Sequence, residues 1–409
     1  MSLKTDALEI AAAAIRAADP YESTCEALRN CLPRDRAFTV FSIGKAAIPM
    51  ARAAADTLGG RIKTGLAVTK YGHTGDFSSP YFQVIEAAHP VSDENSIRAA
   101  ETALAIADTL GGDDIAVVLL SGGGSALFEK SLIPPEVQRE ITKKLLARGA
   151  EIGEINAVRR RISAVKGGKF AARCYPAKVI TFALSDVLNN DKSVIASGIT
   201  VKDDTPDSFV KAVADRYLYD ADASVLDALY HKEEAPVNDG GYRFVGDINL
   251  LCEAAKVRAE ALGYQAEIVS KALTGEAREQ AEAILAASSE RSGKRAYLYG
   301  GETTVTLKGS GLGGRNQEMA LAAAIALKGR NGIAFCSVGS DGTDGPTDAA
   351  GGCADGDTYA KMQTAGVTPE AALADNDSYH ALKAAGDLIV TGPTGTNVND
   401  LTFVLTDAR

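Results

Sequence analysis

The stretch AVVLLSGGGSALFEK (residues 116–130) places three glycines and a serine directly behind an apolar run. The apolar residues predict a buried strand at 115–121. Glycines at the end of a strand let backbone N–H groups come close to an anion, because no Cβ stands in the way. The segment therefore predicts a cradle for a negatively charged oxygen, formed by Ser121, Gly122, Gly123, Gly124 and Ser125.

The alternative for this stretch is a tight strand-to-helix turn that holds no ligand. The sequence lacks the motif G-x-x-x-x-G-K-[ST], and it lacks a G-x-G-x-x-G motif followed by an acidic residue about 20 positions on. Glycine content alone therefore does not decide between a phosphate cradle and a plain turn.

A second strand-to-helix turn carries Gly44 and Lys45, in FSIGKAAIPMA. The helix dipole disfavours a lysine at a helix start, so we interpret Lys45 as a functional cation rather than a solvated side chain. Ligands of open α/β sheets gather beyond the carboxyl ends of the strands. We therefore expect this turn and the glycine stretch to contribute to one site.

Four aspartates are candidate metal ligands. Asp186 follows the expected strand 177–185, and SVGSDGTDGPTDAAGG (337–352) carries Asp341, Asp344 and Asp348. Three carboxylates so close in sequence repel one another unless a cation or a basic group lies between them. Mg²⁺ suits such oxygen ligands, and which of the aspartates would bind it stays open. The alternatives are a capping role for Asp186 and turn formation for the other three.

The segment 300–327 runs from a strand through a glycine-rich loop into a helix that starts at Arg315 and Asn316. The planar guanidinium of Arg315 suits a phosphate or a carboxylate, and a pair with Glu318 is the alternative. The basic group Arg159–Arg161 with Lys166 and Lys169 is more typical of a solvated helix face than of a substrate anchor.

Four scattered histidines lack metal-ligand spacing. We expect a surface or structural place for His89, although it follows a strand. The others are His73, His231 and His380.

The order of elements predicts an α/β protein. Short apolar strands alternate with amphipathic helices, which is typical of parallel sheets covered by helices. A chain of 409 residues exceeds a single core of roughly 250–300 residues, so we expect two domains. The segment 231–241 loses its apolar period, and we expect a larger domain at 1–235 and a smaller one at 236–387. Residues 388–409 are free to pack back on the larger domain.

Composition limits the function. A net charge of -10 argues against a nucleic acid or an anionic membrane surface as partner, whereas a small anionic substrate needs only a locally basic site. The six cysteines form no C-x-x-C pair and read as reduced thiols. With no apolar run of about 20 residues and no secretory pattern, we expect a cytoplasmic enzyme.

Several motifs in order resemble the class II glycerate 2-kinase family, also called the MOFRL family, whose members often carry the label hydroxypyruvate reductase. The matching segments cover about residues 40–401 and are SIGKAA, HPVSDENS, LLSGGGSAL, NAVRRRISAVKGGK, LSDV, SVIASG, GGETTVTLKGSGLGGRNQE, SVGSDGTDGPTDAAGG and TGPTGTNVNDL.

The resemblance implies transfer of the γ-phosphoryl group of ATP to the 2-hydroxyl of D-glycerate, giving 2-phosphoglycerate, with Mg²⁺ or another divalent metal. It also implies a Rossmann-like larger domain, a smaller α/β domain and an active site in the cleft between them. By motif, the catalytic residues are Lys45 and Arg315, and we expect Gly44, Glu302, Asn316 and the residues of the glycine cradle to bind ATP or substrate.

The division of labour stays open. Lys45 and Arg315 would serve the γ-phosphoryl group and the glycerate carboxylate in either order, and the cradle would hold a phosphate of ATP or that carboxylate. The aspartates would bind Mg²⁺ or orient the attacking hydroxyl.

The chain departs from the family pattern at Leu188–Asn190, where Pro-Gly-Asp is common, at ASGIT (196–200) and at Tyr299. These departures leave open the exact 2-hydroxy acid and the geometry of that loop. The sequence also leaves open whether the protein forms a homo-oligomer. The alternative functions are an NAD(P)H-dependent hydroxypyruvate reductase, a relative acting on another 2-hydroxy acid, and a binding or regulatory protein. The missing dinucleotide motif argues against the reductase.

Overall fold

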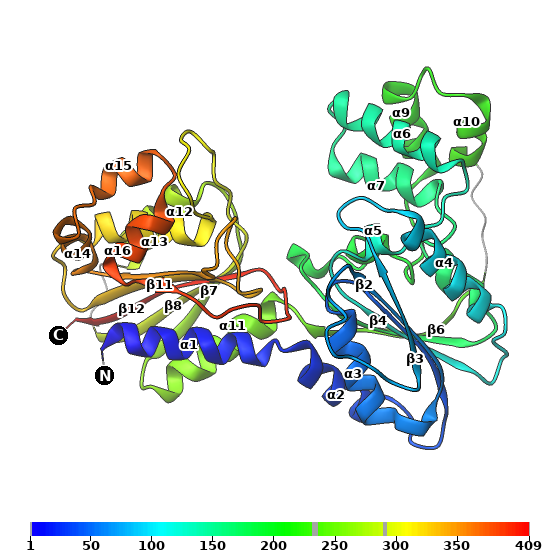
Figure 1. The fold of residues 1–409 in the computed structure, drawn as a ribbon, viewed down its shortest axis with the longest axis horizontal. Helices are drawn as coiled ribbons and strands as arrows, with labels where there is room; N and C mark the ends of the chain where they lie inside the picture. Colours follow the sequence, from blue (N-terminus) through cyan, green and yellow to red (C-terminus); the bar gives the residue numbers. More distant parts are fainter. Residues whose placement is uncertain (1, 231–235, 289–292, 409) are drawn as a thin grey trace. The chain divides into compact units, whose positions relative to one another are not determined.

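The computed structural model describes residues 2–230, 236–288 and 293–408, and the chain forms two compact units (Figure 1). We call residues 20–184 and 191–245 the lysine unit, because they contain Lys45. Residues 1–19, 185–190 and 246–409 form the arginine unit, which contains Arg315. Among the residues described, no helix has the length and apolar character needed to cross a bilayer.

The lysine unit is built on a six-stranded sheet with the order β3-β2-β1-β4-β5-β6. The pairs β3-β2, β2-β1, β1-β4 and β4-β5 are all parallel. Every residue of β1 and β4 is buried, as expected for central strands covered on both faces. The strands are β1 (Phe38–Ile43), β2 (Ile62–Lys70), β3 (Phe82–Ala87), β4 (Ile115–Leu120), β5 (Lys178–Leu184) and β6 (Asn238–Gly246).

The helices of this unit play two roles. α3 packs on β1 and β2, and α4 packs on β3, while four helices form a separate small core around residues such as Leu145 and Val210. These four are α6 (Pro135–Ala147), α7 (Ile152–Arg161), α9 (Asp207–Tyr217) and α10 (Ala223–Tyr230). The others are α2 (Pro20–Cys31), α3 (Ala47–Leu58), α4 (Glu94–Ala107), α5 (Gly124–Leu127) and α8 (Lys169–Arg173).

The arginine unit holds a second six-stranded sheet, of order β11-β10-β9-β12-β8-β7. It is mixed: β12 runs antiparallel to both β8 and β9, and β7 runs parallel to β8. Its strands are β7 (Gln265–Leu273), β8 (Gly293–Gly301), β9 (Ile333–Gly339), β10 (Gly351–Asp355), β11 (Leu388–Ile389) and β12 (Asp400–Ala408).

Helices cover both faces of this second sheet (Figure 1). α13 contributes Met319 and Leu321 to the core on one face, and α1 and α11 contact each other and the sheet on the other. The helices are α1 (Leu3–Ala17), α11 (Ile248–Ala261), α12 (Ala277–Ser288), α13 (Arg315–Ala326), α14 (Thr358–Thr364), α15 (Pro369–Ala374) and α16 (Ser378–Ala385).

The prediction of an α/β fold with a mainly parallel sheet in one domain is confirmed, while three segments belong to other units than expected. α1 packs in the arginine unit, β6 is in the lysine unit's sheet, and β12 lies inside the second sheet. The side chains of Leu401, Phe403 and Leu405 are fully buried, and the backbone of β12 pairs with β8 on one side and β9 on the other, as in a central strand. The expected boundary at residue 235 falls on 231–235, which lie outside the described residues, as does His231.

Candidate active site

In the lysine unit, the turns after β1 and β4 interlock. The backbone N–H of Lys45 donates to the carbonyl of Gly122 at 2.8 Å, and the N–H of Ala46 donates to Ser121 Oγ at 3.0 Å. Gly44 has φ 130°, and a Cβ there would lie 2.2 Å from Ser121 Oγ. Glycine is thus required at Gly44 both by its conformation and by the close approach of Ser121. The two motifs predicted to meet at strand ends do meet.

The glycine cradle lies under two side chains. Gly123 has φ 84°, and a Cβ there would come within 3.1 Å of side-chain atoms of both His89 and Lys45. The backbone of Gly123 is therefore exposed to Lys45 and to an imidazole. At the other end, Ser125 Oγ lies 2.8 Å from Ser197 Oγ, and a Cβ on Gly124 would lie 2.8 Å from that of Ala196.

The surroundings of the cradle are basic. Burial, Lys45 and Lys70 lower the pKa of His89, and burial and Lys70 lower the pKa of His73. Glu86 has the opposite effect on His73, whose pKa it raises, and accepts hydrogen bonds from Thr74. No carboxylate pairs with Lys45 in the part of the chain that the structure describes. The lysine charge is thus uncompensated, which favours a bound anion.

In the arginine unit, Arg315 begins α13 and pairs with two carboxylates. Its Nε and Nη2 donate to the two oxygens of Asp400 at 2.5 and 3.0 Å, and its Nη1 lies 2.8 Å from Glu302 Oε1. The predicted alternative partner, Glu318, instead pairs with Arg278 at 2.8 Å. The guanidinium is therefore held in one orientation by a bidentate contact.

Burial and the mutual contact affect the pKa of both Arg315 and Asp400. Burial opposes the charge of Arg315, but its contacts with Asp400 and Glu302 outweigh that effect and raise its pKa. Burial raises the pKa of Asp400 to about 6, against the influence of Arg315. At neutral pH both groups are therefore ionised, and Asp400 becomes protonated in mild acid.

Asn399 connects this pair to Asp186. Its Nδ2 donates to the backbone carbonyl of Asp186 at 3.0 Å and to Glu302 Oε2 at 3.3 Å. The chain leaves the first sheet after Leu184, and the segment 185–190 packs with the arginine unit. Asp186, which the sequence analysis placed in the larger domain, therefore lies beside the Arg315 cluster.

The aspartates of 337–352 have separate environments. Asp344 is buried and accepts hydrogen bonds from the backbone N–H groups of Asn316 and Gln317, so it caps α13. Asp341 accepts from the backbone of Thr343, and Asp348 accepts from the hydroxyl of Tyr379. Across residues 2–230, 236–288 and 293–408, no group of three or more His, Cys, Asp or Glu side chains is placed to hold a metal ion.

Asn316, predicted to bind ligand, is buried at the start of α13. Its Nδ2 donates to Asp344 at 3.3 Å, and its Oδ1 accepts from Ser337 Oγ at 2.6 Å. Its amide therefore serves the fold around Arg315. A cavity of about 720 Å³ opens beside Arg315, and its lining includes the acidic Glu302 and Asp344 and the apolar Val305 and Leu307.

The prediction of a solvated face for the basic group at 159–169 was wrong. Arg161 is 3% exposed, Lys166 is fully buried against Glu129, and Lys169 Nζ donates to three backbone carbonyls.

Sequence reasoning also missed residues of both sites, because their partners are distant in the chain. The available signal for His89 was its place after a predicted strand; the other missed residues are Lys70, Ser197, Asn399 and Asp400.

The fold is that of a two-sheet α/β protein, with Lys45 and Arg315 at turns that lead into helices, one in each unit. A family described as "Domain of unknown function (DUF4147)" matches residues 6–230, and the MOFRL family matches residues 295–400. The D-glycerate 2-kinase of Thermotoga maritima is 44% identical over 98% of this chain and 97% of its own length.

Further relatives carry similar names and match nearly the whole chain. A glycerate 2-kinase of Pyrococcus horikoshii is 38% identical over 100% of this chain and 98% of its own. A putative hydroxypyruvate reductase of Agrobacterium vitis is 41% identical over 96% and 92%. The crystal structure of a Thermotoga maritima glycerate kinase superposes with a TM-score of 0.94 at 43% identity, covering 99% of each chain. The chain belongs to the glycerate 2-kinase family that carries the MOFRL domain.

Proposed function

We propose that this protein transfers the γ-phosphoryl group of ATP to the 2-hydroxyl of D-glycerate. The oxygen at C2 forms the new P–O bond, the bond from the γ-phosphorus to the bridging oxygen breaks, and ADP leaves as the hydroxyl gives up its proton. The observation that carries the proposal is the uncompensated Lys45 above the glycine cradle, in a chain 44% identical to a D-glycerate 2-kinase.

The lysine unit supplies charge without a counter-ion. Phosphoryl transfer requires positioning and positive charge around the equatorial oxygens of the migrating group, with little covalent chemistry by the protein. Lys45 and the N–H groups of Gly122–Ser125 can provide both, because the interlocked turns fix the backbone before the ligand arrives. Neutral His89 adds a polar group at the same place without a second charge.

The arginine unit supplies an oriented fork. Asp400 fixes the plane of the Arg315 guanidinium through Nε and Nη2, while Nη1 contacts Glu302, which is 46% exposed and can turn away. A phosphate or carboxylate oxygen of the reactants would take the place of Glu302. Catalysis then draws on Lys45 and Arg315 together, one serving the γ-phosphoryl group and the other the glycerate carboxylate.

A divalent metal would enter with the nucleotide. Mg²⁺ usually keeps several waters and binds through one or two carboxylates plus substrate phosphates, so a complete protein cage is not required. Asp186 beside the Arg315 cluster and Asp341 fit that role better than Asp344, whose oxygens cap α13. When bound, the metal would neutralise charge on the phosphates.

A coupled assay tests the function and the position of transfer. Enzyme, ATP, Mg²⁺ and D-glycerate are combined with enolase, pyruvate kinase and lactate dehydrogenase, with and without phosphoglycerate mutase. We expect NADH oxidation without the mutase, because enolase accepts the 2-phosphate and not the 3-phosphate. A requirement for the mutase would show transfer to the 3-hydroxyl, and no ADP formation with any 2-hydroxy acid would refute the kinase.

The reductase alternative is tested in a separate reaction by the same absorbance measurement of NADH. NADH or NADPH oxidation with hydroxypyruvate, in the absence of ATP and coupling enzymes, would favour it. We expect none above the rate without enzyme.

A further inference from the structure

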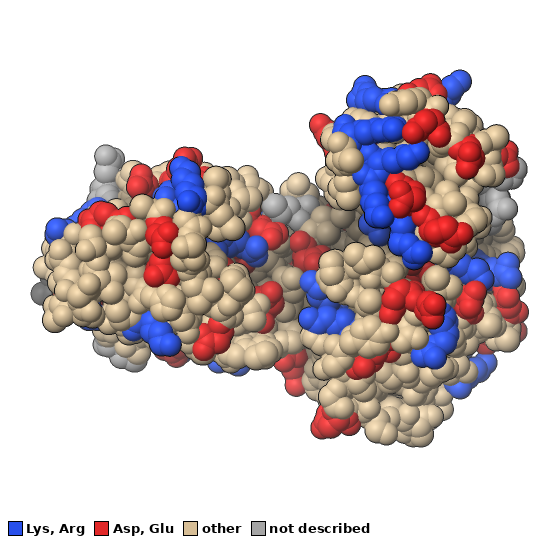
Figure 2. All heavy atoms as spheres, turned by 45° about the horizontal axis from the view of Figure 1, so that its top comes forward, with Lys and Arg blue, Asp and Glu red and all other residues tan. Residues whose placement is uncertain are grey.

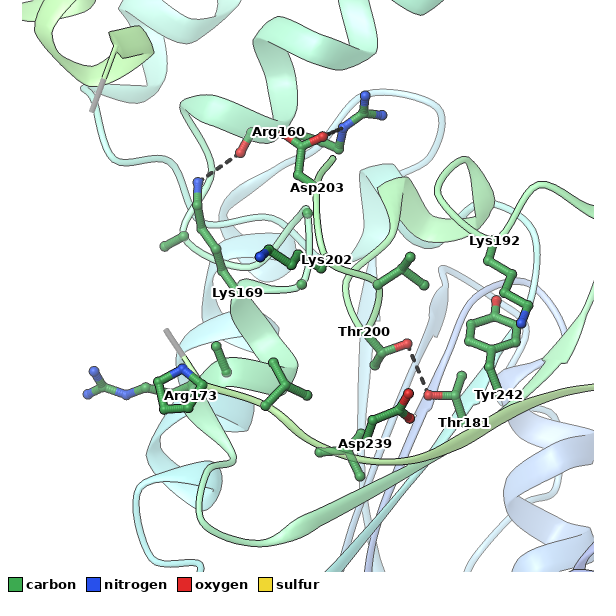
Figure 3. A pocket seen from close by; sticks show the side chains of 18 of the residues that line it. Arg160, Lys169, Arg173, Thr181, Lys192, Thr200, Lys202, Asp203, Asp239 and Tyr242 are labelled. Atoms are coloured by element: carbon green, nitrogen blue, oxygen red, sulfur yellow. Dashed lines mark hydrogen bonds and ion pairs between the residues drawn. The ribbon is translucent and has the colours of Figure 1, made fainter. Parts of the chain in front are cut away.

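The lysine unit contains a second, larger cavity, of about 980 Å³, within the size range of small-molecule sites (Figure 3). Residues of α8, β5, β6 and the segment 200–203 line it. Lys45 and the glycines of the cradle are not among its lining residues. The cavity is therefore a separate place from the candidate active site.

The lining is basic in an acidic protein. Seven of its residues are Lys or Arg and two are Asp, an excess of five positive charges, while the whole chain carries -10. Figure 2 shows that Lys and Arg side chains also gather in a band over the helical part of this unit. Such local concentration against the overall charge attracts anions and raises their concentration at the site.

Some of these cations build the wall, and others can meet a ligand. Arg160 pairs with Asp203 at 3.0 Å, and Lys169 is held by backbone carbonyls. Lys192 and Lys202 are exposed side chains, and Lys192 Nζ lies 5.2 Å from the centre of the Tyr242 ring. Figure 3 shows Lys192 and Tyr242 at one side of the cavity and Lys202 with Lys169 at the other.

Buried polar atoms in this lining lack hydrogen-bond partners. Nη1 and Nε of Arg161 and the hydroxyl of Tyr242 form no hydrogen bond within the described part of the chain, although Nε lies 3.5 Å from Asp203. Buried donors without partners are costly, and each one in a native fold calls for an explanation such as a bound ligand.

We propose that this cavity binds an anion with two or more linked phosphate groups. Cations at opposite sides of the cavity favour an extended anion over a single phosphate, and the lining also includes apolar side chains such as Leu104 and Val179. The shared chemistry is the polyphosphate group, whether it belongs to a nucleotide or to a free polyphosphate.

The cavity wall is connected to the cradle by hydrogen bonds. Gly167 and Gly168, both in the wall, donate to the carbonyls of Ser197 and Gly198 at 3.1 and 2.7 Å. Ser197 Oγ in turn lies 2.8 Å from Ser125 Oγ. The segment 197–198 therefore contacts both the cavity wall and the Ser125 end of the cradle.

The sequence contains no tryptophan, so the fluorescence of one introduced tryptophan reports on its own surroundings. Leu132 lines the cavity and is 55% exposed, so Leu132→Trp introduces a single tryptophan there. We expect ADP or inorganic tripolyphosphate to cause a saturable fluorescence change. The midpoint should rise at least about 10-fold when Lys192→Ala and Lys202→Ala are added, and it should stay within about 2-fold when Lys45→Met is added instead.

Val257→Trp is the matched control, since Val257 is 65% exposed on α11 of the arginine unit. Saturation with ADP alone would identify a nucleotide as the ligand, and equal midpoints would identify the phosphate chain. A midpoint that moves with Lys45→Met and not with the cavity variants would overturn the proposal, as would no saturable change.

If Leu132→Trp fails to fold, as judged by circular dichroism, calorimetric titration of the chain with its natural Leu132 gives the same comparison. The cavity variants should then lose one class of ADP site, and Lys45→Met should not remove that class. Binding is measured without turnover, so failure here is distinct from failure of the kinase assay.

Discussion

Lys45 and Arg315 are both cations at turns that lead into helices, and their electrostatic environments are opposite. Lys45 has Lys70 and neutral His89 near it and, among the described residues, no carboxylate partner. Arg315 is bound by Asp400 and Glu302. An unpaired charge contributes mainly attraction for an anion, whereas a paired guanidinium contributes a fixed direction at a reduced net charge.

The largest effect should come from Lys45→Met, which removes the charge and keeps most of the stem. We expect kcat to fall about 10³-fold, the upper range for loss of one preorganised stabilising group. Lys63→Met is the control, because Lys63 is a 57% exposed lysine of the same unit that pairs with Asp114. Turnover of both variants is measured by the coupled assay, and equal activity would remove Lys45 from the mechanism.

Arg315→Ala should lower kcat by at least roughly 10²-fold. It should also destabilise the arginine unit, because Asp400 is left as a buried carboxylate without its partner. Arg315→Lys separates the two contributions: the charge is retained and the bidentate contact is lost. Compared with Arg315→Ala, we expect Arg315→Lys to be more stable in thermal denaturation. Its kcat in the coupled assay should be little higher. Near-normal turnover of Arg315→Ala would contradict the assignment.

Asp400→Asn tests the contribution of the pair between Asp400 and Arg315 through the pH dependence of kcat. The folded-state pKa of about 6 exceeds the usual 3.8, so protonation of Asp400 contributes stability that is fully present below pH 3.8 and is lost as the pH rises through about 6. The activity should instead fall as the pH falls, because protonated Asp400 no longer forms an ion pair with Arg315 and no longer fixes its orientation. We expect kcat of the natural enzyme to fall below pH 6, and Asp400→Asn to be about 10-fold slower without that limb. An acid limb that persists in Asp400→Asn would assign it to another group.

Much of the lysine site could be predicted from sequence, because its parts are local. The runs before Gly44 and Gly122 are apolar and short, each run ends in glycine, and the carboxyl ends of parallel strands share one edge. His89 was missed because its contact with Gly123 depends on how β3 is placed in the sheet.

The arginine site was less predictable, because its partners come from distant segments. Arg315 was identified by its planar guanidinium at the expected start of a helix, but Asp400 is 85 residues away and reaches it only through insertion of β12 between β8 and β9. Likewise, Asp344 carries the same turn signals as Asp341 and Asp348, and only its burial shows that it caps α13. Local pattern cannot report which carboxylate finds which cation.

The smallest effect should come from Gly123→Ala, which tests whether the backbone beneath Lys45 must stay open. The added methyl would lie 3.1 Å from the Lys45 and His89 side chains at φ 84°, so it strains the turn and occupies space above the cradle. Gly149→Ala is a matched control, since Gly149 has φ 77° with nothing within 4 Å of the added methyl. Both should lose about 1 kcal/mol of stability from the backbone conformation. Only Gly123→Ala should raise the KM for ATP, by roughly 10-fold, because a methyl in the cradle excludes close approach of an anion. Equal KM values for the two variants would mean that the ligand does not contact Gly123, and that the charge of Lys45 acts from another direction.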